Sequence, residues 1–441
     1  MSLRFDNKVA IVTGAGGGLG RTYALELAKR GAKIVVNDLG GDRHGTSSST
    51  SMADKVVNEI KSAGGQAVAN YDSVEFGDKI VKTAIDNFGR VDIVINNAGI
   101  LRDVSFLKMT ENDWDLIFKV HVKGAYAVTK AAWPYMRDQK YGRIIVTSSN
   151  AGVCGNFGQA NYAAAKSALI GFSNSLAQEG AKYNILSNVL VPTAGSRLTQ
   201  TIMPENLVAA LKPEYVTPLV VYMTHDSFKN SGNVYEAGAG WYGQVQYYKT
   251  KGKVIVNPTV EDVAKNWSQV TDLSGAQPIA DMKDSMTLLM GALDAQESAA
   301  ATTTNTTTSS ATTGATGGAF PANIKSSALF QEMADGIKAD PKAVATVKSI
   351  IVYSITDGKT ELGKFTLDFK SATPSVYFGD IKTGDKANAV VTVADQDFLD
   401  IAAGKLNAQK AFMGGKLKVK GNVMLLQKLQ GVLEKAKKSK L

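Results

Sequence analysis

Alternation of apolar strands with helical runs through the first 240 residues is the feature that most constrains the fold. The expected strands are KVAIVTG, KIVVNDL, QAVANYD, VDIVINNAG, RIIVTSS and NILSNVLVP, with NVYEAGAG at residues 233–240 as the last. Strands that are apolar along nearly their whole length are buried on both faces, which is typical of a parallel sheet between two layers of helices. The sequence therefore predicts an α/β fold with a doubly wound parallel sheet.

A low-complexity segment at residues 296–319, QESAAATTTNTTTSSATTGATGGA, separates this region from the rest of the chain. It contains no large apolar side chain, so it cannot bury enough surface to repay the entropy of ordering. We expect a flexible Thr/Ser/Ala/Gly linker between a first module, residues 1–295, and a second, residues 320–441. The second module groups its strands between helical stretches, which indicates a smaller α+β domain.

The first strand runs into a glycine-rich turn and then a helix, the order that a Rossmann-like dinucleotide site requires. We expect this turn to contact a pyrophosphate, because missing Cβ atoms permit close approach and a helix N-terminus attracts anions. The expected contacts are Gly14, Gly18, Leu19 and Gly20. The next strand ends at Asp38, whose carboxylate should accept hydrogen bonds from ribose hydroxyls and repel a 2′-phosphate. The cofactor is therefore predicted to be NAD, although Arg43 nearby leaves NADP open.

Tyr162 and Lys166 stand four residues apart in an alanine-rich helical run, so they share one helix face. Ser149 lies thirteen residues before the tyrosine, at the carboxyl end of the strand RIIVTSS. A nearby lysine ammonium should lower the pKa of a tyrosine from its usual value near ~10. Tyr162 could then accept the proton of a secondary alcohol while Ser149 holds the substrate oxygen. We predict these three residues as the catalytic group.

The glycine spacing G-x-x-x-G-x-G, the turn Asn96–Gly99 and the Ser-Tyr-Lys group resemble the short-chain dehydrogenase/reductase family over most of residues 5–245. The resemblance implies that Asp72 and Ser73 flank the adenine and that Asn97 supports the nicotinamide-side ribose. It also implies that Ala194 and Gly195 wrap the carboxamide and pyrophosphate, and that Tyr162 and Lys166 contact the cofactor. Members of this family usually associate through the dehydrogenase unit, so a homodimer is expected.

One position departs from the family pattern. Members carry an asparagine in the helix upstream of the catalytic tyrosine, whereas this chain has His121 in the run VHVKG. His121 is therefore an accessory candidate. Its role is open between holding a water or proton relay and simple packing.

Three further segments indicate the substrate. GNFGQANY, PTAGSRLTQTIMPENL and NSGNVYEAGAGWYG resemble the (3R)-hydroxyacyl-CoA dehydrogenase part of the peroxisomal multifunctional enzymes of type two. This resemblance implies a fatty acyl-CoA thioester as substrate and a role in β-oxidation. The central hydratase domain of those enzymes has no counterpart here, and all three histidines fall in the first module. No hydration of enoyl-CoA is therefore expected.

The second module resembles the sterol carrier protein type two family through NAQKAFM and GGKLKVKGN, over nearly all of residues 322–441. Family members hold lipid or fatty acyl-CoA in an apolar tunnel. The resemblance implies that the C-terminal helix lines such a tunnel here with Met424, Leu425, Leu429 and Val432. The alternative is a packed core without a cavity, which periodicity does not distinguish from a tunnel.

Two other functions remain open at this stage. The first is an NAD-dependent hydroxysteroid or other secondary-alcohol dehydrogenase, because the catalytic group does not select the substrate. The second is a lipid-transfer protein with a vestigial dehydrogenase fold. Intact Ser149, Tyr162 and Lys166 argue against the second.

The chain ends in Ser439-Lys440-Leu441, a tripeptide that a peroxisomal import receptor reads, so we expect the peroxisome matrix. Its one cysteine, Cys154, allows no intrachain disulfide, which agrees with a reducing compartment. No apolar run reaches the ~18–20 residues of a transmembrane segment. The net charge of +9 comes with no arginine cluster, so nucleic acid is not an expected partner, and no metal site is predicted.

Overall fold

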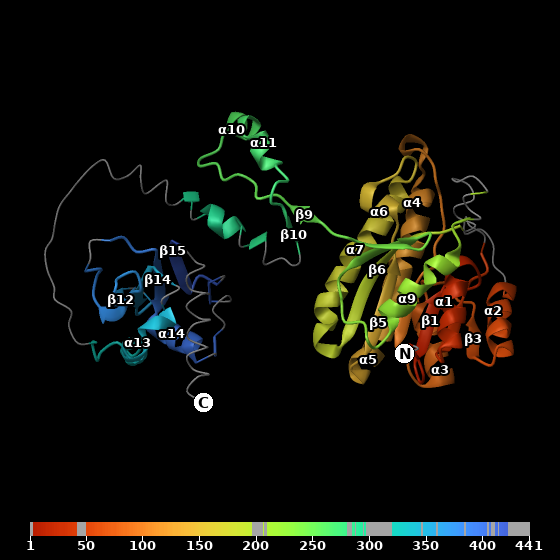
Figure 1. Cartoon of the computed structure of the whole chain (residues 1–441), viewed down its shortest axis with the longest axis horizontal. Coiled ribbons are helices and arrows are strands. Elements are labelled where there is room, and N and C mark those ends of the chain that lie inside the picture. The colour runs from red at the N-terminus through yellow and green to blue at the C-terminus, as the bar shows by residue number, and fades with distance from the viewer. Residues whose placement is uncertain are drawn as a thin grey trace. The chain divides into compact units, whose positions relative to one another are not determined.

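The computed structural model of the chain divides into two compact units, Met1–Gln246 and Tyr247–Leu441, which are described separately (Figure 1). The structure describes residues 3–41, 50–195, 206, 210–279, 285–286, 288–293, 295–296, 320–344, 347–358, 360–382, 385–403, 405–406, 411–412 and 414–421. Several predicted features lie outside the described residues: Arg43, most of the linker, the tunnel-lining side chains of the C-terminal helix and the import tripeptide.

The first unit is built on one eight-stranded sheet with the strand order β3-β2-β1-β4-β5-β6-β7-β8. Its strands are β1 (Val9–Thr13), β2 (Lys33–Asn37), β3 (Gln66–Asn70), β4 (Ile93–Asn96), β5 (Gly142–Thr147), β6 (Ile185–Thr193), β7 (Val234–Gly238) and β8 (Trp241–Val245). All neighbours from β3 to β7 pair in parallel, which confirms the predicted fold class. The antiparallel β8 was not predicted; it returns from β7 through Ala239 and Gly240, both at positive φ, as a tight hairpin requires.

Two layers of helices cover the faces of this sheet (Figure 1). The helices are α1 (Gly18–Lys29), α2 (Ser51–Ser62), α3 (Gly77–Phe88), α4 (Glu111–Phe118), α5 (Gly124–Gln139), α6 (Asn150–Cys154), α7 (Ala160–Gly180) and α9 (Thr217–Thr224). Strand β1 shows how the layers form, because its side chains alternate between faces. Ala10 and Val12 pack in a core with α1, α2 and α9, whereas Val9 and Ile11 pack in a core with α3, α5 and α7.

The chain winds outward in both directions from the adjacent strands β1 and β4. The connections that follow β1 and β4 therefore leave on opposite faces of the sheet. This opens a crevice at the carboxyl ends of the strands, where open α/β sheets bind ligands. Most of the predicted site residues follow such strand ends, whereas Tyr162, Lys166 and His121 lie in helical segments.

The second unit contains a separate five-stranded sheet with the order β13-β12-β11-β14-β15. Its described elements are β9 (Tyr248–Lys249), α10 (Val260–Lys265), α11 (Trp267–Val270), β10 (Gln277–Pro278), α13 (Ser327–Ala339), β11 (Ile350–Thr356), β12 (Glu361–Asp368), β13 (Ser375–Phe378), β14 (Ala389–Ala394), α14 (Asp395–Ala402) and β15 (Leu417–Gly421). Only β11 and β14 pair in parallel; the other pairs are antiparallel, as in an α+β domain. Stacked rings fill its core, with the centroid of Phe330 4.0 Å from that of Phe365 and 5.0 Å from that of Phe398.

The two units separate at Gln246, before the predicted module boundary at residue 295. The reason is local: the chain leaves the large sheet after β8, and β9 and β10 pair with each other instead. The predicted limits 1–295, 296–319 and 320–441 stay predictions. Among the described residues, no helix is long and apolar enough to cross a membrane.

Candidate active site

The predicted site residues lie at the carboxyl ends of six neighbouring strands. The glycine turn follows β1, Asp38 follows β2, Asp72 and Ser73 follow β3, Asn97 follows β4, Ser149 follows β5, and Ala194 and Gly195 follow β6. Parallel strands bring their carboxyl ends to one edge of a sheet. Residues spread over about 180 positions of the sequence therefore share one edge.

The glycine turn is in direct contact with the side chain of Asp38. The carboxylate of Asp38 accepts hydrogen bonds from the backbone N–H groups of Gly16 and Gly40, both at 2.7 Å. A Cβ atom on Gly16 would lie 2.7 Å from that carboxylate, so only glycine fits there. Gly14 has φ +64° and lies so close to Ala98 that a Cβ atom on Gly14 would be 2.8 Å from the Cα atom of Ala98. The residues present thus fit a dinucleotide: the turn offers close backbone approach, and a carboxylate stands beside it.

Asn97 makes contacts within the protein that differ from its predicted role. Its side-chain nitrogen donates to the carbonyl oxygens of Thr13, at 3.0 Å, and Gly14, at 3.2 Å. The Thr13 hydroxyl in turn accepts from the backbone N–H groups of Asn97 and Ala98. Asn97 therefore locks the glycine turn to β4, and its contact with a ribose stays a prediction.

The predicted adenine-side residues are held by a buried pair of asparagines. Asn37 donates to the backbone carbonyl of Asp72 at 2.9 Å, and Asn70 donates to its carboxylate at 2.9 Å. Ser73 follows directly and hydrogen-bonds Glu75 at 3.2 Å. These bonds fix the backbone that would flank an adenine.

Ala194 and Gly195 are the last described residues after β6 before residue 206. Ala194 is buried, and the Gly195 N–H donates to the carbonyl oxygen of Leu211. They lie at the same edge of the sheet as the glycine turn, as predicted. Their contact with a cofactor stays a prediction.

Tyr162 and Lys166 are on the first two turns of α7 and meet Ser149 at the end of β5. The Lys166 Nζ lies 5.4 Å from the centre of the Tyr162 ring and donates to the carbonyl oxygen of Thr147 at 2.6 Å. Ser149 caps α6, its hydroxyl accepting from the N–H of Ala151 at 3.2 Å. The structure thus brings the three predicted catalytic residues together.

The pKa of Tyr162 corrects one step of the sequence argument. Burial raises this pKa to about 12, a hydrogen bond with Ser149 lowers it, and the charge of Asp103 raises it. The lysine ammonium was expected to lower the pKa of Tyr162 below its usual value. The reason for the difference is desolvation, which disfavours the phenolate, and which also lowers the pKa of Lys166 to about 7 because it disfavours the ammonium. Within the protein alone, burial thus disfavours both the phenolate of Tyr162 and the ammonium of Lys166.

His121 lies in a π-helical turn, Lys119–Lys123, that joins α4 to α5. Its ring is 3% exposed and meets the Tyr162 ring edge to face, with 5.4 Å between the centroids. The Nε2 atom lies 2.9 Å from the carbonyl oxygen of Ile100. Burial, followed by the charge of Lys166, holds the pKa of His121 well below its usual value, so the imidazole is neutral. The other ring nitrogen, Nδ1, is buried and has no hydrogen-bond partner among the described residues, so both roles left open stay predictions.

Two residues that the sequence did not single out, Asn161 and Gln159, position the catalytic helix. Asn161 is buried, and its side chain donates to the carbonyl oxygens of Arg102 and Asp113. Gln159 donates to the Asp103 carboxylate at 2.7 Å. Gln159 and Asn161 stand within the motif GNFGQANY, but nothing in the motif says which distant backbone groups they bind. The only sequence sign of their importance was that both lie within three positions of Tyr162.

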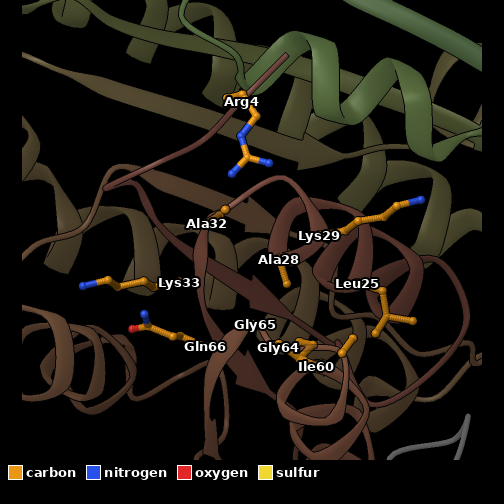
Figure 2. Close-up of a pocket in the computed structure, with 12 residues that line it drawn as sticks. Arg4, Leu25, Ala28, Lys29, Ala32, Lys33, Ile60, Gly64, Gly65 and Gln66 are labelled. Atoms are coloured by element: carbon orange, nitrogen blue, oxygen red, sulfur yellow. The ribbon is translucent and has the colours of Figure 1, made fainter. Parts of the chain in front are cut away.

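A hollow of about 420 Å³ lies at the opposite edge of the sheet (Figure 2). It is bounded by the C-terminal end of α1, the start of β2 and the turn between α2 and β3, with Arg4, Lys29 and Lys33 around it. None of the predicted site residues lines it. Because ligands of such sheets bind at the carboxyl ends of the strands, this hollow is not the candidate active site.

Comparisons with known proteins agree with the two-module architecture. A family model described as short chain dehydrogenase matches residues 8–207, and one described as SCP-2 sterol transfer family matches residues 330–434. Peroxisomal multifunctional enzyme A of Dictyostelium discoideum is 46% identical over 443 residues, which cover 99% of this chain and 100% of that protein.

Longer relatives match about two thirds of this chain. Peroxisomal multifunctional enzyme type 2 of Mus musculus is 54% identical over 287 residues, which cover 64% of this chain and only 39% of the mouse protein. The structure of the full-length type 2 enzyme from Drosophila melanogaster is similar with a TM-score of 0.57 and 44% identity, over 67% of this chain and 50% of that one.

Proposed function

This chain belongs to the short-chain dehydrogenase family, and we propose its function from that premise. It joins a dehydrogenase module to an SCP-2 module, and the Dictyostelium protein matches it over the whole length. The proposal is that it oxidises (3R)-3-hydroxyacyl-CoA to 3-ketoacyl-CoA with NAD, as a step of peroxisomal fatty acid β-oxidation. The names of its relatives support the pathway. They also confirm the predicted location, because these relatives are named peroxisomal enzymes.

The observation that carries the proposal is the meeting of Tyr162, Lys166 and Ser149 at the sheet edge that also holds the glycine turn and Asp38. A lipid-transfer protein with a vestigial dehydrogenase fold would need none of these contacts. The buried amine of Lys166 is especially costly to keep without a use, since desolvation disfavours its charged form.

Each side chain has a defined task in this reaction. Tyr162 in its phenolate form accepts the proton of the 3-hydroxyl, and Ser149 donates a hydrogen bond to the same oxygen as it becomes a carbonyl. The Lys166 ammonium stabilises the phenolate. NAD, when bound, would accept the hydride from C3, so each turnover yields one ketone, one NADH and one proton. The R stereochemistry rests on the resemblance to type 2 enzymes.

Purified protein should reduce NAD with (3R)-3-hydroxyacyl-CoA and not with the (3S) isomer. The measurement is NADH absorbance with both isomers, with a 3-hydroxysteroid as the competing substrate class. Activity restricted to the steroid would contradict the proposal. In the same assay, enoyl-CoA without added hydratase should give no hydroxyacyl product, because all three histidines lie in the dehydrogenase module.

Replacing Asp38 by Asn should weaken the use of NAD. The carboxylate that would bind the ribose hydroxyls becomes a neutral amide, and a hydrogen bond to a charged group contributes about 1.5–3 kcal/mol, so KM for NAD should rise about 10–100-fold. KM for NADP should fall relative to it. Glu26→Gln, which removes a carboxylate from a surface ion pair on α1, is the matched control. An unchanged KM for NAD in a folded D38N variant would refute the assignment.

The second module is proposed to carry lipid or acyl-CoA for the dehydrogenase. Its tether would raise the local concentration of substrate at the first module. Import through the C-terminal tripeptide and assembly as a homodimer belong to the same proposal.

A further inference from the structure

Three large apolar side chains beside the candidate active site lie almost entirely in solvent. Phe106 is 76% exposed and Leu107 is 96% exposed, both in the 3₁₀ turn Phe106–Lys108 between β4 and α4. Phe157 is 93% exposed, in the loop between α6 and α7. We call these three side chains the apolar rim.

The two loops that carry the rim are fastened to each other. The N–H of Val104 donates to the carbonyl oxygen of Gly158 at 2.8 Å, and Gln159 donates to Asp103 at 2.7 Å. One step further in, Asn161 donates to the carbonyl oxygen of Arg102 at 3.1 Å. These bonds form a ladder that runs from the residue before Tyr162 out to the rim, so the rim is held in place relative to the catalytic tyrosine.

Apolar side chains held in water lose the free energy that burial would provide, and such surfaces mark binding sites. The three rim side chains are uncharged, which suits a hydrocarbon chain, and the exposed Lys108 follows them at the end of the same turn. It is also small. Three side chains alone fall well short of the ~1,200–2,000 Å² that a stable protein interface buries, so by themselves they match a hydrocarbon chain better than a second copy.

We propose that the apolar rim is the subsite for the acyl chain of the substrate, and that it sets a preference for long chains. This inference rests on the proposed function, which places the 3-hydroxyl at Tyr162. The hydrocarbon beyond C3 then leaves the catalytic centre along the ladder and covers Leu107 and Phe157.

The test is a chain-length series on the full chain. kcat/KM is measured for 3-hydroxyacyl-CoA substrates of four to sixteen carbons with the wild type, with L107S/F157S, and with Tyr222→Ser, which removes a half-exposed aromatic ring from α9. The double variant should lose about tenfold in kcat/KM for the sixteen-carbon substrate and change less than about twofold for the four-carbon one. Tyr222→Ser should keep the wild-type profile.

The outcomes separate the two proposals. A wild type that oxidises no hydroxyacyl-CoA of any length refutes the proposed function. An active wild type whose chain-length profile survives in the double variant refutes the rim subsite alone. Equal losses at every length, together with a changed sedimentation coefficient, would also refute it, because the rim would then be an interface between copies.

Discussion

Replacing Tyr162 by Phe should lower kcat for hydroxyacyl-CoA oxidation about 10³-fold or more. The substitution removes one hydroxyl and leaves the ring that packs against His121. General base catalysis contributes ~10²–10⁴-fold, and this hydroxyl is also the atom that Ser149 bonds. The measurement is single-turnover NADH formation at saturating substrate. NADH binding, followed by fluorescence, should weaken only slightly, because Tyr162 is one predicted cofactor contact among several and the glycine turn and Asp38 are untouched.

Tyr183→Phe provides the control for loss of a tyrosine hydroxyl, because Tyr183 follows the far end of α7. It should keep the wild-type rate. Lipid binding by the second module should be the same in both variants. If Y162F oxidised substrate at more than about a tenth of the wild-type rate, another group would have to be the base, and the mechanism would be wrong.

The sequence predicted the layers of the first module well because its signals are local. Apolar runs such as Val9–Thr13 and Lys33–Asn37 are buried on both faces, and that pattern alone places them inside a parallel sheet. The glycine turn and Asp38 were likewise readable, since a strand, a turn without Cβ atoms and a helix follow each other directly. The hairpin strand β8 was missed because it is largely exposed and lacks the apolar run of its neighbours.

The contacts that shape the candidate site are the part that local patterns do not encode. Asn161 binds backbone carbonyls 48 and 59 positions away, and a sequence pattern carries no sign of such partners. The π-helical turn that places His121 against Tyr162 depends on how α4 and α5 pack. The same holds for the pKa of Tyr162, since spacing places a lysine near a tyrosine but does not measure how far each is desolvated.

Lys166→Met should shift the pH dependence of alcohol oxidation to higher pH. Tyr162 must be deprotonated to accept the alcohol proton, so the rate falls as pH falls below its pKa. Burial raises that pKa to about 12. The Lys166 Nζ lies 5.4 Å from the centre of the Tyr162 ring, and in the proposed mechanism its ammonium lowers this pKa during the reaction. An opposite charge at this range shifts a pKa by ~1–3 units, so the variant should lose about 10–10³-fold in kcat/KM at neutral pH.

The pH profile separates this electrostatic role from a merely structural one. At pH 9–10 the variant should recover part of the lost rate, because a larger fraction of Tyr162 is deprotonated at higher pH. A distorted site would instead stay slow at every pH. The melting temperature should change little, since a methionine avoids the desolvation that lowers the pKa of Lys166 to about 7, which offsets the lost bond to the Thr147 carbonyl. Lys130→Met on the exposed side of α5 is the control. An unchanged profile in K166M would mean that the acidity of Tyr162 is set elsewhere, and the lysine would then be needed only for its bond to the Thr147 carbonyl.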